Sequence, residues 1–162
     1  MDAYEQVQES LKKLGITFET VEHPLALTTE EADKYIIGID GVRTKSMFLT
    51  NKKKTACYLV VLDDSKRLDM NRFKKIVDEN RIKMASPELL MEKMNLTPGI
   101  VSIFGLLNNS SKDIQVYFDK SIMSEKRMSF HPNVNTKTIF ISTSDMLKFI
   151  DKIGFKYSII DL

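Results

Sequence analysis

The stretch VRTKSMFLTNKKKTACYLVVL, residues 42–62, decides the fold because it contains two β-rich runs separated by a short turn. Residues 42–50 are rich in β-branched and other strand-forming side chains. Residues 55–62 are apolar on both faces, which indicates a strand in the middle of a sheet. The turn-like NKKK, residues 51–54, joins the two runs. The pattern predicts a hairpin whose second strand is central.

The segments on either side of this hairpin alternate irregularly between helical and strand patterns. Helices are predicted where apolar spacing or capping signals occur, over residues 4–14, 28–37 (a capping box at Thr28 and Glu31), 69–80, 86–94 (Ser86 as cap, then Pro87) and 143–154. Further strands are predicted over residues 16–22, 113–119, 136–142 and 155–162, and an ordered loop over 97–107. Several strands follow one another without a helix between them. We therefore expect a mixed α/β domain over residues 1–162, with a central mixed sheet surrounded by helices and no doubly wound arrangement.

Composition limits the classes of function. The 162 residues contain 24 basic and 22 acidic side chains, so the chain is almost neutral. This balance argues against extended binding of DNA or other long nucleic acid, which requires many phosphate contacts. The start MDAYEQVQES lacks the pattern of a signal peptide, and the apolar run ACYLVVL is too short to span a membrane. A soluble, cytoplasmic protein is expected.

Metal and cofactor chemistry has little support in the sequence. The two histidines lie about a hundred residues apart, and the single cysteine, Cys57, lies inside an apolar strand. No spacing resembles a zinc site, and Cys57 is predicted to be a small core residue. Nucleotide-binding loops and the G-x-S-x-G elbow of hydrolases are also absent. We expect no metal and no cofactor.

Lys45 is the first residue that suggests chemistry. Strand alternation places it on the same face as Met47 and Leu49. An ammonium group on an apolar face either extends to solvent, pairs with a carboxylate, or meets an anion in a pocket. Nearby positive charges, Arg43 and Lys52–Lys54, form either a solvated hairpin end or a small patch for the end of a nucleic acid.

His131 is the second such residue, in the stretch FHPNVNT, residues 130–136. Pro132 restricts the backbone of His131 to an extended conformation. Asn133 and Asn135 can close the turn through hydrogen bonds from side chain to backbone. From the residues alone, His131 either orders this turn or faces a substrate. His23 is interpreted as the end of a strand.

Four stretches in order resemble one known family: residues 21–32, 43–70, 85–109 and 130–142. Over nearly the whole chain, the sequence is similar to the free-standing prolyl-tRNA editing proteins of the YbaK group of aminoacyl-tRNA synthetase-associated domains. The resemblance implies a compact mixed α/β domain whose central sheet is partly closed. It also implies hydrolysis of the ester in wrongly charged tRNA, most typically alanyl-tRNA(Pro), without a metal.

The resemblance assigns roles to particular residues. Lys45, Gly99 and His131 match the catalytic pocket of the family, with His131 shaping the site or contacting substrate instead of taking a proton. Four further residues are expected to contact substrate: Ser46, Ile103, Phe104 and Asn135. The sequence departs from the family at Ile103, where relatives carry the proline of a G-x-x-x-P loop, and at Ser46, where many carry asparagine.

The departure at Ile103 leaves the amino-acid specificity open, so cysteine or serine are alternatives to alanine. A non-catalytic module that binds a tRNA end, a small amino acid or a protein is the alternative from a different class. The expected partners are the acceptor end of mischarged tRNA and prolyl-tRNA synthetase.

Overall fold

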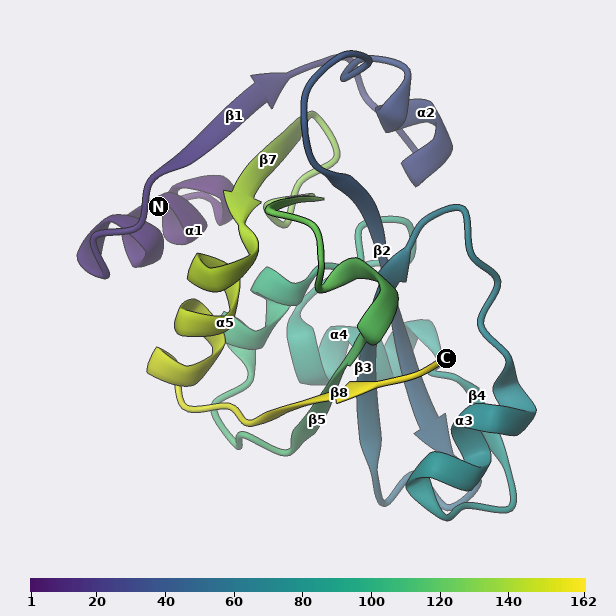
Figure 1. The fold of residues 1–162 in the computed structure, drawn as a ribbon. Coiled ribbons are helices and arrows are strands. Elements are labelled where there is room, and N and C mark those ends of the chain that lie inside the picture. Colours follow the sequence, from purple (N-terminus) through teal and green to yellow (C-terminus); the bar gives the residue numbers. More distant parts are fainter.

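Strand β2 (Val42–Asn51) is the longest strand and pairs with three others in the computed structural model, which describes residues 1–162 (Figure 1). Antiparallel β3 (Cys57–Asp63) lies along it from Thr44 to Thr50, as the hairpin pattern predicts. The other partners of β2 are parallel β6 (Arg127–Phe130) at its start and antiparallel β4 (Ile82–Met84) at its end. Strand β2 therefore connects the two halves of the sheet.

The complete sheet has eight strands in the order β1-β7-β6-β2-β3-β5-β8, with β4 beside β2. Its remaining strands are β1 (Phe18–Glu22), β5 (Ile114–Asp119), β7 (Lys137–Ser142) and β8 (Tyr157–Ile160). The β3–β5 and β5–β8 pairs are parallel, whereas the β1–β7 and β6–β7 pairs are antiparallel. The predicted mixed α/β class is confirmed.

The helices surround this sheet (Figure 1). They are α1 (Ala3–Lys13), α2 (Thr29–Asp33), α3 (Met70–Val77), α4 (Pro87–Met94), α5 (Thr143–Lys152) and the 3₁₀-helices η1 (Ile103–Asn108) and η2 (Lys120–Ile122). Helices α1 and α5 lie side by side, and the Lys148 ammonium of α5 donates to the carbonyl of Leu14 at 3.2 Å. None of the helices has the length and apolar composition needed to cross a bilayer.

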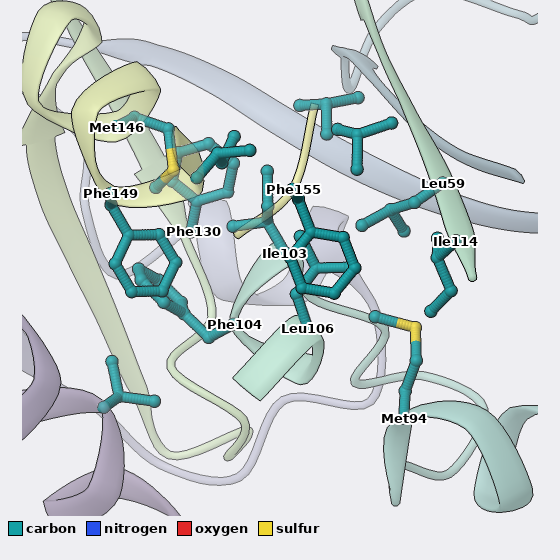
Figure 2. Packing of buried hydrophobic residues seen from close by; sticks show 14 of the residues in the cluster. Leu59, Met94, Ile103, Phe104, Leu106, Ile114, Phe130, Met146, Phe149 and Phe155 are labelled. Atoms are coloured by element: carbon teal, nitrogen blue, oxygen red, sulfur yellow. The ribbon is translucent and has the colours of Figure 1, made fainter. Parts of the chain in front are cut away.

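The main hydrophobic core joins both halves of the sheet. Its 26 buried residues include Met128 and Ile139 from β6 and β7, and Leu59 and Val116 from β3 and β5. Figure 2 shows part of this core, in which Phe104 of η1 lies near Phe130 and Phe149. Because one core is shared by both halves, the sheet curves around it. Cys57 is buried, as predicted, and its burial raises the pKa of the thiol.

Three predictions of local structure need correction. The second helix ends at Asp33 instead of continuing to residue 37, although its capping box is present: Thr28 accepts from the N–H of Glu31. The segment predicted as a loop contains η1, which begins after Ser102 as cap. Strands β4 and β6 were not predicted, because each has only three or four residues and neither alternates clearly.

Candidate functional site

Three segments far apart in the sequence meet beside β6. The backbone N–H groups of His23 and Ala26 donate to the carbonyls of Thr136 and Asn135, at 2.9 and 3.0 Å. The Ser102 hydroxyl donates to the carbonyl of His131. Residues 23–28 and the loop 97–102 are therefore both fixed to the turn 131–136. This junction contains two of the three residues predicted to be catalytic, Gly99 and His131.

Lys45 reaches the same region through β2. The parallel ladder between β2 and β6 pairs Val42 with Met128 and Arg43 with Ser129. Lys45 and His131 each lie two residues beyond the last of these pairs, Lys45 within β2 and His131 just after β6 ends at Phe130. Lys45 is half-buried, and its ammonium forms no hydrogen bond or ion pair within the chain. The ladder therefore leads to both residues at the same end of the β2–β6 pair.

The environment of His131 favours the neutral imidazole. Burial lowers the pKa of His131, and the nearby His23 lowers it further, while the backbone of Lys137 has the opposite effect. Its Nδ1 atom is buried without a hydrogen-bond partner. A neutral ring can donate through one nitrogen and accept through the other. His131 is therefore suited to hydrogen bonding with a ligand and poorly suited to carrying a positive charge.

His23 has a larger role than its sequence suggested. It is buried, its ring stacks on Tyr35 with a centroid distance of 5.4 Å, and its Nδ1 lies 2.9 Å from the carbonyl of Pro24. A carbonyl only accepts, so Nδ1 carries a proton, and in the neutral ring Nε2 accepts from the Thr138 hydroxyl at 2.9 Å. His23 therefore fixes residues 23–35 over the site. In the sequence, the only feature that His23 and His131 share is the proline that follows each of them.

Gly99 occupies a position that excludes other residues. Its φ angle is +94°, and a Cβ atom there would lie 3.2 Å from the carbonyl oxygen of Leu27. A side chain would be strained and would push the segment 23–28 away from the loop. Gly99 thus permits the close contact between two of the three segments.

The predicted substrate-contacting residues lie in different places. Ser46 follows Lys45 in the strand and so lies on the opposite face, with Phe48. Ile103 and Phe104 are 0% exposed, and the Phe104 ring packs on Phe130 and Phe149 at centroid distances of 6.0 and 5.3 Å (Figure 2). Both residues therefore belong to the main hydrophobic core. Only Asn135 lies at the junction itself, where its backbone carbonyl accepts from Ala26.

The asparagines do not close the turn as predicted. Both polar atoms of the Asn133 side chain, Oδ1 and Nδ2, are buried without a partner. The side chain of Asn135 forms no hydrogen bond within the chain. Asn133 instead has a φ angle of 61°, in the left-handed region that asparagine tolerates better than most residues. The turn therefore depends on the backbone conformation of Asn133 and on the bonds of its neighbours.

The positive charges around the hairpin separate into two groups. The Arg43 guanidinium donates to the carbonyls of Gly41 and Ile36, both at 2.6 Å, and lies over the Phe140 ring. Arg43 therefore helps to hold the segment after α2. Lys52–Lys54 are exposed at the far end of the hairpin, seven or more residues along the strand from Lys45. They do not form one patch with Lys45.

A carboxyl pair lies beside Arg43. Burial, together with the nearby Asp64 carboxyl, raises the pKa of Asp33 to about 8. The backbone N–H of Asp64 donates to the carbonyl of Arg43 at 2.8 Å. At neutral pH the Asp33 carboxyl is therefore largely protonated. No group of three or more His, Cys, Asp or Glu side chains is arranged to hold a metal ion.

Around β6 the chain thus offers one ammonium without an internal partner, one imidazole whose pKa is lowered, and a tight glycine loop. This chemistry suits the positioning of a reactive ester and the stabilisation of charge on its carbonyl oxygen. Residues 23–149 match the aminoacyl-tRNA editing domain family, so the chain belongs to that family. Enzymes of this class remove amino acids from mischarged tRNA, and the predicted membership is confirmed.

The more specific likeness is to proteins that edit prolyl-tRNA. The chain is 32% identical to the prolyl-tRNA editing protein ProX of Acetoanaerobium sticklandii, over 100% of this chain and 99% of that protein. It is 26% identical to prolyl-tRNA synthetase associated domain-containing protein 1 of Danio rerio, over 94% of this chain and 83% of that protein. The crystal structure of a candidate trans-editing enzyme for prolyl-tRNA synthetase has the same fold, with a TM-score of 0.78 at 20% identity, covering 100% of this chain and 97% of that one.

Proposed function

We propose that this protein hydrolyses the ester bond of alanyl-tRNA(Pro) in trans, in the cytoplasm, and so corrects errors of prolyl-tRNA synthetase. The observation that carries the proposal is the β2–β6 ladder, which leads to Lys45 on one strand and to the turn of His131 on the other, in a chain of the editing family. Lys45 has no partner within the chain, so its charge is available to a phosphate or to the polar atoms of the ester.

Each residue is given a role that fits its surroundings. Lys45 holds the terminal nucleotide, and backbone N–H groups of the Gly99 loop bind the ester carbonyl, where negative charge develops. His131 stays neutral and orients the substrate through a hydrogen bond. An activated ester needs little more than positioning and an oriented water, and a hydroxyl group of the terminal ribose supplies that orientation.

Discrimination between alanine and proline follows from size. A synthetase pocket built for proline cannot strongly exclude the smaller alanine, because the lost apolar contacts are worth about 1–3 kcal/mol. A smaller second pocket accepts alanine and excludes proline by steric overlap. The close packing of Gly99 against the Leu27 carbonyl, which leaves no free space for a side chain at position 99, is consistent with a small pocket.

The test is a deacylation panel with tRNA(Pro) charged with alanine, cysteine, serine or proline, without added metal. We expect rapid release of alanine and no release of proline. Lys45→Ala should lower the rate by about 100-fold or more, as expected for loss of a group that stabilises transition-state charge. Lys156→Ala, at an exposed lysine after α5, is the matched control and should leave the rate unchanged.

Other results of this panel identify the alternatives. Faster release of cysteine or serine would assign another small amino acid to the site. Saturable binding of charged tRNA without hydrolysis would favour the non-catalytic module. An increase in rate on adding prolyl-tRNA synthetase would support the synthetase as a partner.

A further inference from the structure

Ser102 forms the only hydrogen bond between the loop 97–102 and the turn 131–136. Its hydroxyl donates to the backbone carbonyl of His131. No backbone N–H group of either segment donates to a carbonyl of the other. The loop that carries Gly99 is therefore joined to His131 by one side chain.

The hydroxyl of Ser102 is fully used within the chain. The residue is 1% exposed, so a substrate cannot reach it. While the hydroxyl donates to His131, its oxygen accepts from the N–H of Phe104 at 3.2 Å and caps the helix η1. A hydroxyl offers one donor and accepts as well, and Ser102 uses both capacities. Any effect of Ser102 on the chemistry must therefore act through the two segments that it joins.

The position of Ser102 is set by the main core. The next two residues, Ile103 and Phe104, are 0% exposed and lie among the core side chains (Figure 2). Close packing at the start of η1 leaves little freedom for the residue before it. The bond to His131 thus relates the turn to the most rigid part of the domain.

Packing alone would not orient the turn. The Phe104 ring contacts Phe130, directly before His131, at a centroid distance of 6.0 Å and holds the two segments close together. Apolar contacts have little directional preference, whereas a hydrogen bond to a carbonyl requires alignment of donor and acceptor. The bond from Ser102 therefore fixes the orientation of the peptide group that follows His131.

We propose that Ser102 is a positioning residue of the deacylation site, which sets His131 against the backbone N–H groups of the Gly99 loop. The proposed function needs both at one ester, because His131 orients the substrate while the loop binds the carbonyl oxygen. An error of about 1 Å in such a geometry can lower a rate about 100-fold. The inference rests on the proposed function and adds the residue that sets the spacing of its two parts.

The experiment compares Ser102→Ala with a matched control, Ser86→Ala. Ser86 caps α4, where its hydroxyl accepts from the N–H of Leu89 at 3.1 Å, and it has no bond to either segment of the site. Each variant therefore loses one helix cap, and only Ser102→Ala also loses the bond to His131. Urea denaturation establishes that both variants are folded before the kinetics are measured.

Steady-state deacylation of alanyl-tRNA(Pro) separates positioning from capping. For Ser102→Ala we expect kcat to fall about 10- to 100-fold and KM to change less than about threefold, since misplaced groups mainly weaken contacts made in the transition state. Ser86→Ala should keep both constants of the unaltered protein. Unaltered kinetics in Ser102→Ala would show that Ser102 only caps η1 and would overturn the proposal.

NMR titration of the His131 ring gives a second result that does not depend on hydrolysis. Burial lowers the pKa of His131 in the folded chain. Because a released turn lets water reach the ring, this pKa should rise towards its ordinary value in Ser102→Ala and stay lowered in Ser86→Ala. A His131 pKa that is the same in the two variants would contradict the proposal.

Two further outcomes are separable. If Ser102→Ala does not fold, Ser102→Gly replaces it in both measurements, because glycine also lacks the hydroxyl and is a better helix cap than alanine. If the unaltered protein releases no amino acid in the deacylation panel, the proposed function is refuted. The NMR titration then still decides whether Ser102 holds His131 in place.

Discussion

Two turns of this protein are built around a buried asparagine, and the two asparagines are used in opposite ways. At the hairpin, Asn51 is 5% exposed and forms four hydrogen bonds: its Nδ2 donates to Thr55 and Glu79, and its Oδ1 accepts from the N–H groups of Thr55 and Ala56. In the turn after β6, Asn133 is equally buried at 4% and forms none. Asn51 stabilises the fold, whereas Asn133 has its hydrogen-bonding capacity unused.

The unused hydrogen-bonding capacity is confined to a few residues. The four buried side-chain atoms without a partner belong to Asp64, directly after β3, and to His131 and Asn133, in the turn 131–136. Buried polar groups are otherwise almost always paired in proteins, so unpaired ones require an explanation. For His131, in the candidate site, a bound substrate is the explanation that also fits the family.

The largest expected effect tests what holds the second turn in place. Phe104→Ala removes the ring that packs on Phe130, directly before His131, and should lower the free energy of unfolding by about 3–5 kcal/mol. Urea denaturation measures this. Phe104→Leu keeps most of the volume and is the control, with a smaller loss expected. A loss below about 1 kcal/mol for Phe104→Ala would show that the turn does not depend on the core beneath it.

Asn51→Ala should lower the free energy of unfolding by about 2 kcal/mol, because it removes the four hydrogen bonds of the buried Asn51 amide. Asn133→Gly, which breaks no hydrogen bond, should cost less than about 1 kcal/mol under the same conditions. Activity per folded molecule should be unchanged in Asn51→Ala. If both variants lose the same free energy of unfolding, the two asparagines do not differ in how much they stabilise the fold.

The sequence predicted the first of these turns better than the second. The apolar run at residues 55–62 and the NKKK turn identify the hairpin because the signals are local. In FHPNVNT the signals are ambiguous: the proline and asparagines indicate a turn, but the bonds that hold it come from residues 23, 26 and 102. No local pattern could reveal those partners. For the same reason the stacking of His23 on Tyr35 was missed, and Ile103 and Phe104 were expected at the substrate instead of in the core.

His131→Ala tests whether the second turn serves the substrate or the fold. We expect deacylation to fall about tenfold, which corresponds to about 1.4 kcal/mol, since one hydrogen bond to the substrate is lost. The free energy of unfolding should change by less than about 1 kcal/mol, because the Nδ1 atom has no partner within the chain. Steady-state kinetics and urea denaturation of the same preparation check both values. An unfolded variant would mean that His131 only orders the turn.

The smallest effect concerns the proton that the Asp33 carboxyl retains beside Asp64, at the end of α2. The pKa of Asp33 is raised from 3.8 to about 8, so the folded chain keeps a proton that the unfolded chain loses near pH 4. This contribution to stability is complete below about pH 4 and is lost as the pH rises towards 8. Asn in place of Asp33 can still donate to Asp64 and does not titrate. Asp33→Asn should therefore gain stability relative to the unaltered protein between about pH 5 and pH 8, by about 1 kcal/mol, because the half-exposed pair is screened by solvent.

Asp151→Asn, on the exposed side of α5, corrects this comparison for the general effect of removing one negative charge. Thermal unfolding of the two variants and the unaltered protein across the same pH range measures the difference. If the two variants show the same pH dependence, the pKa of Asp33 is not raised in the folded chain. Residues 23–28 would then be held by the backbone bonds of His23 and Ala26 to Thr136 and Asn135, and the segment after α2 by the bond of Arg43 to the carbonyl of Ile36.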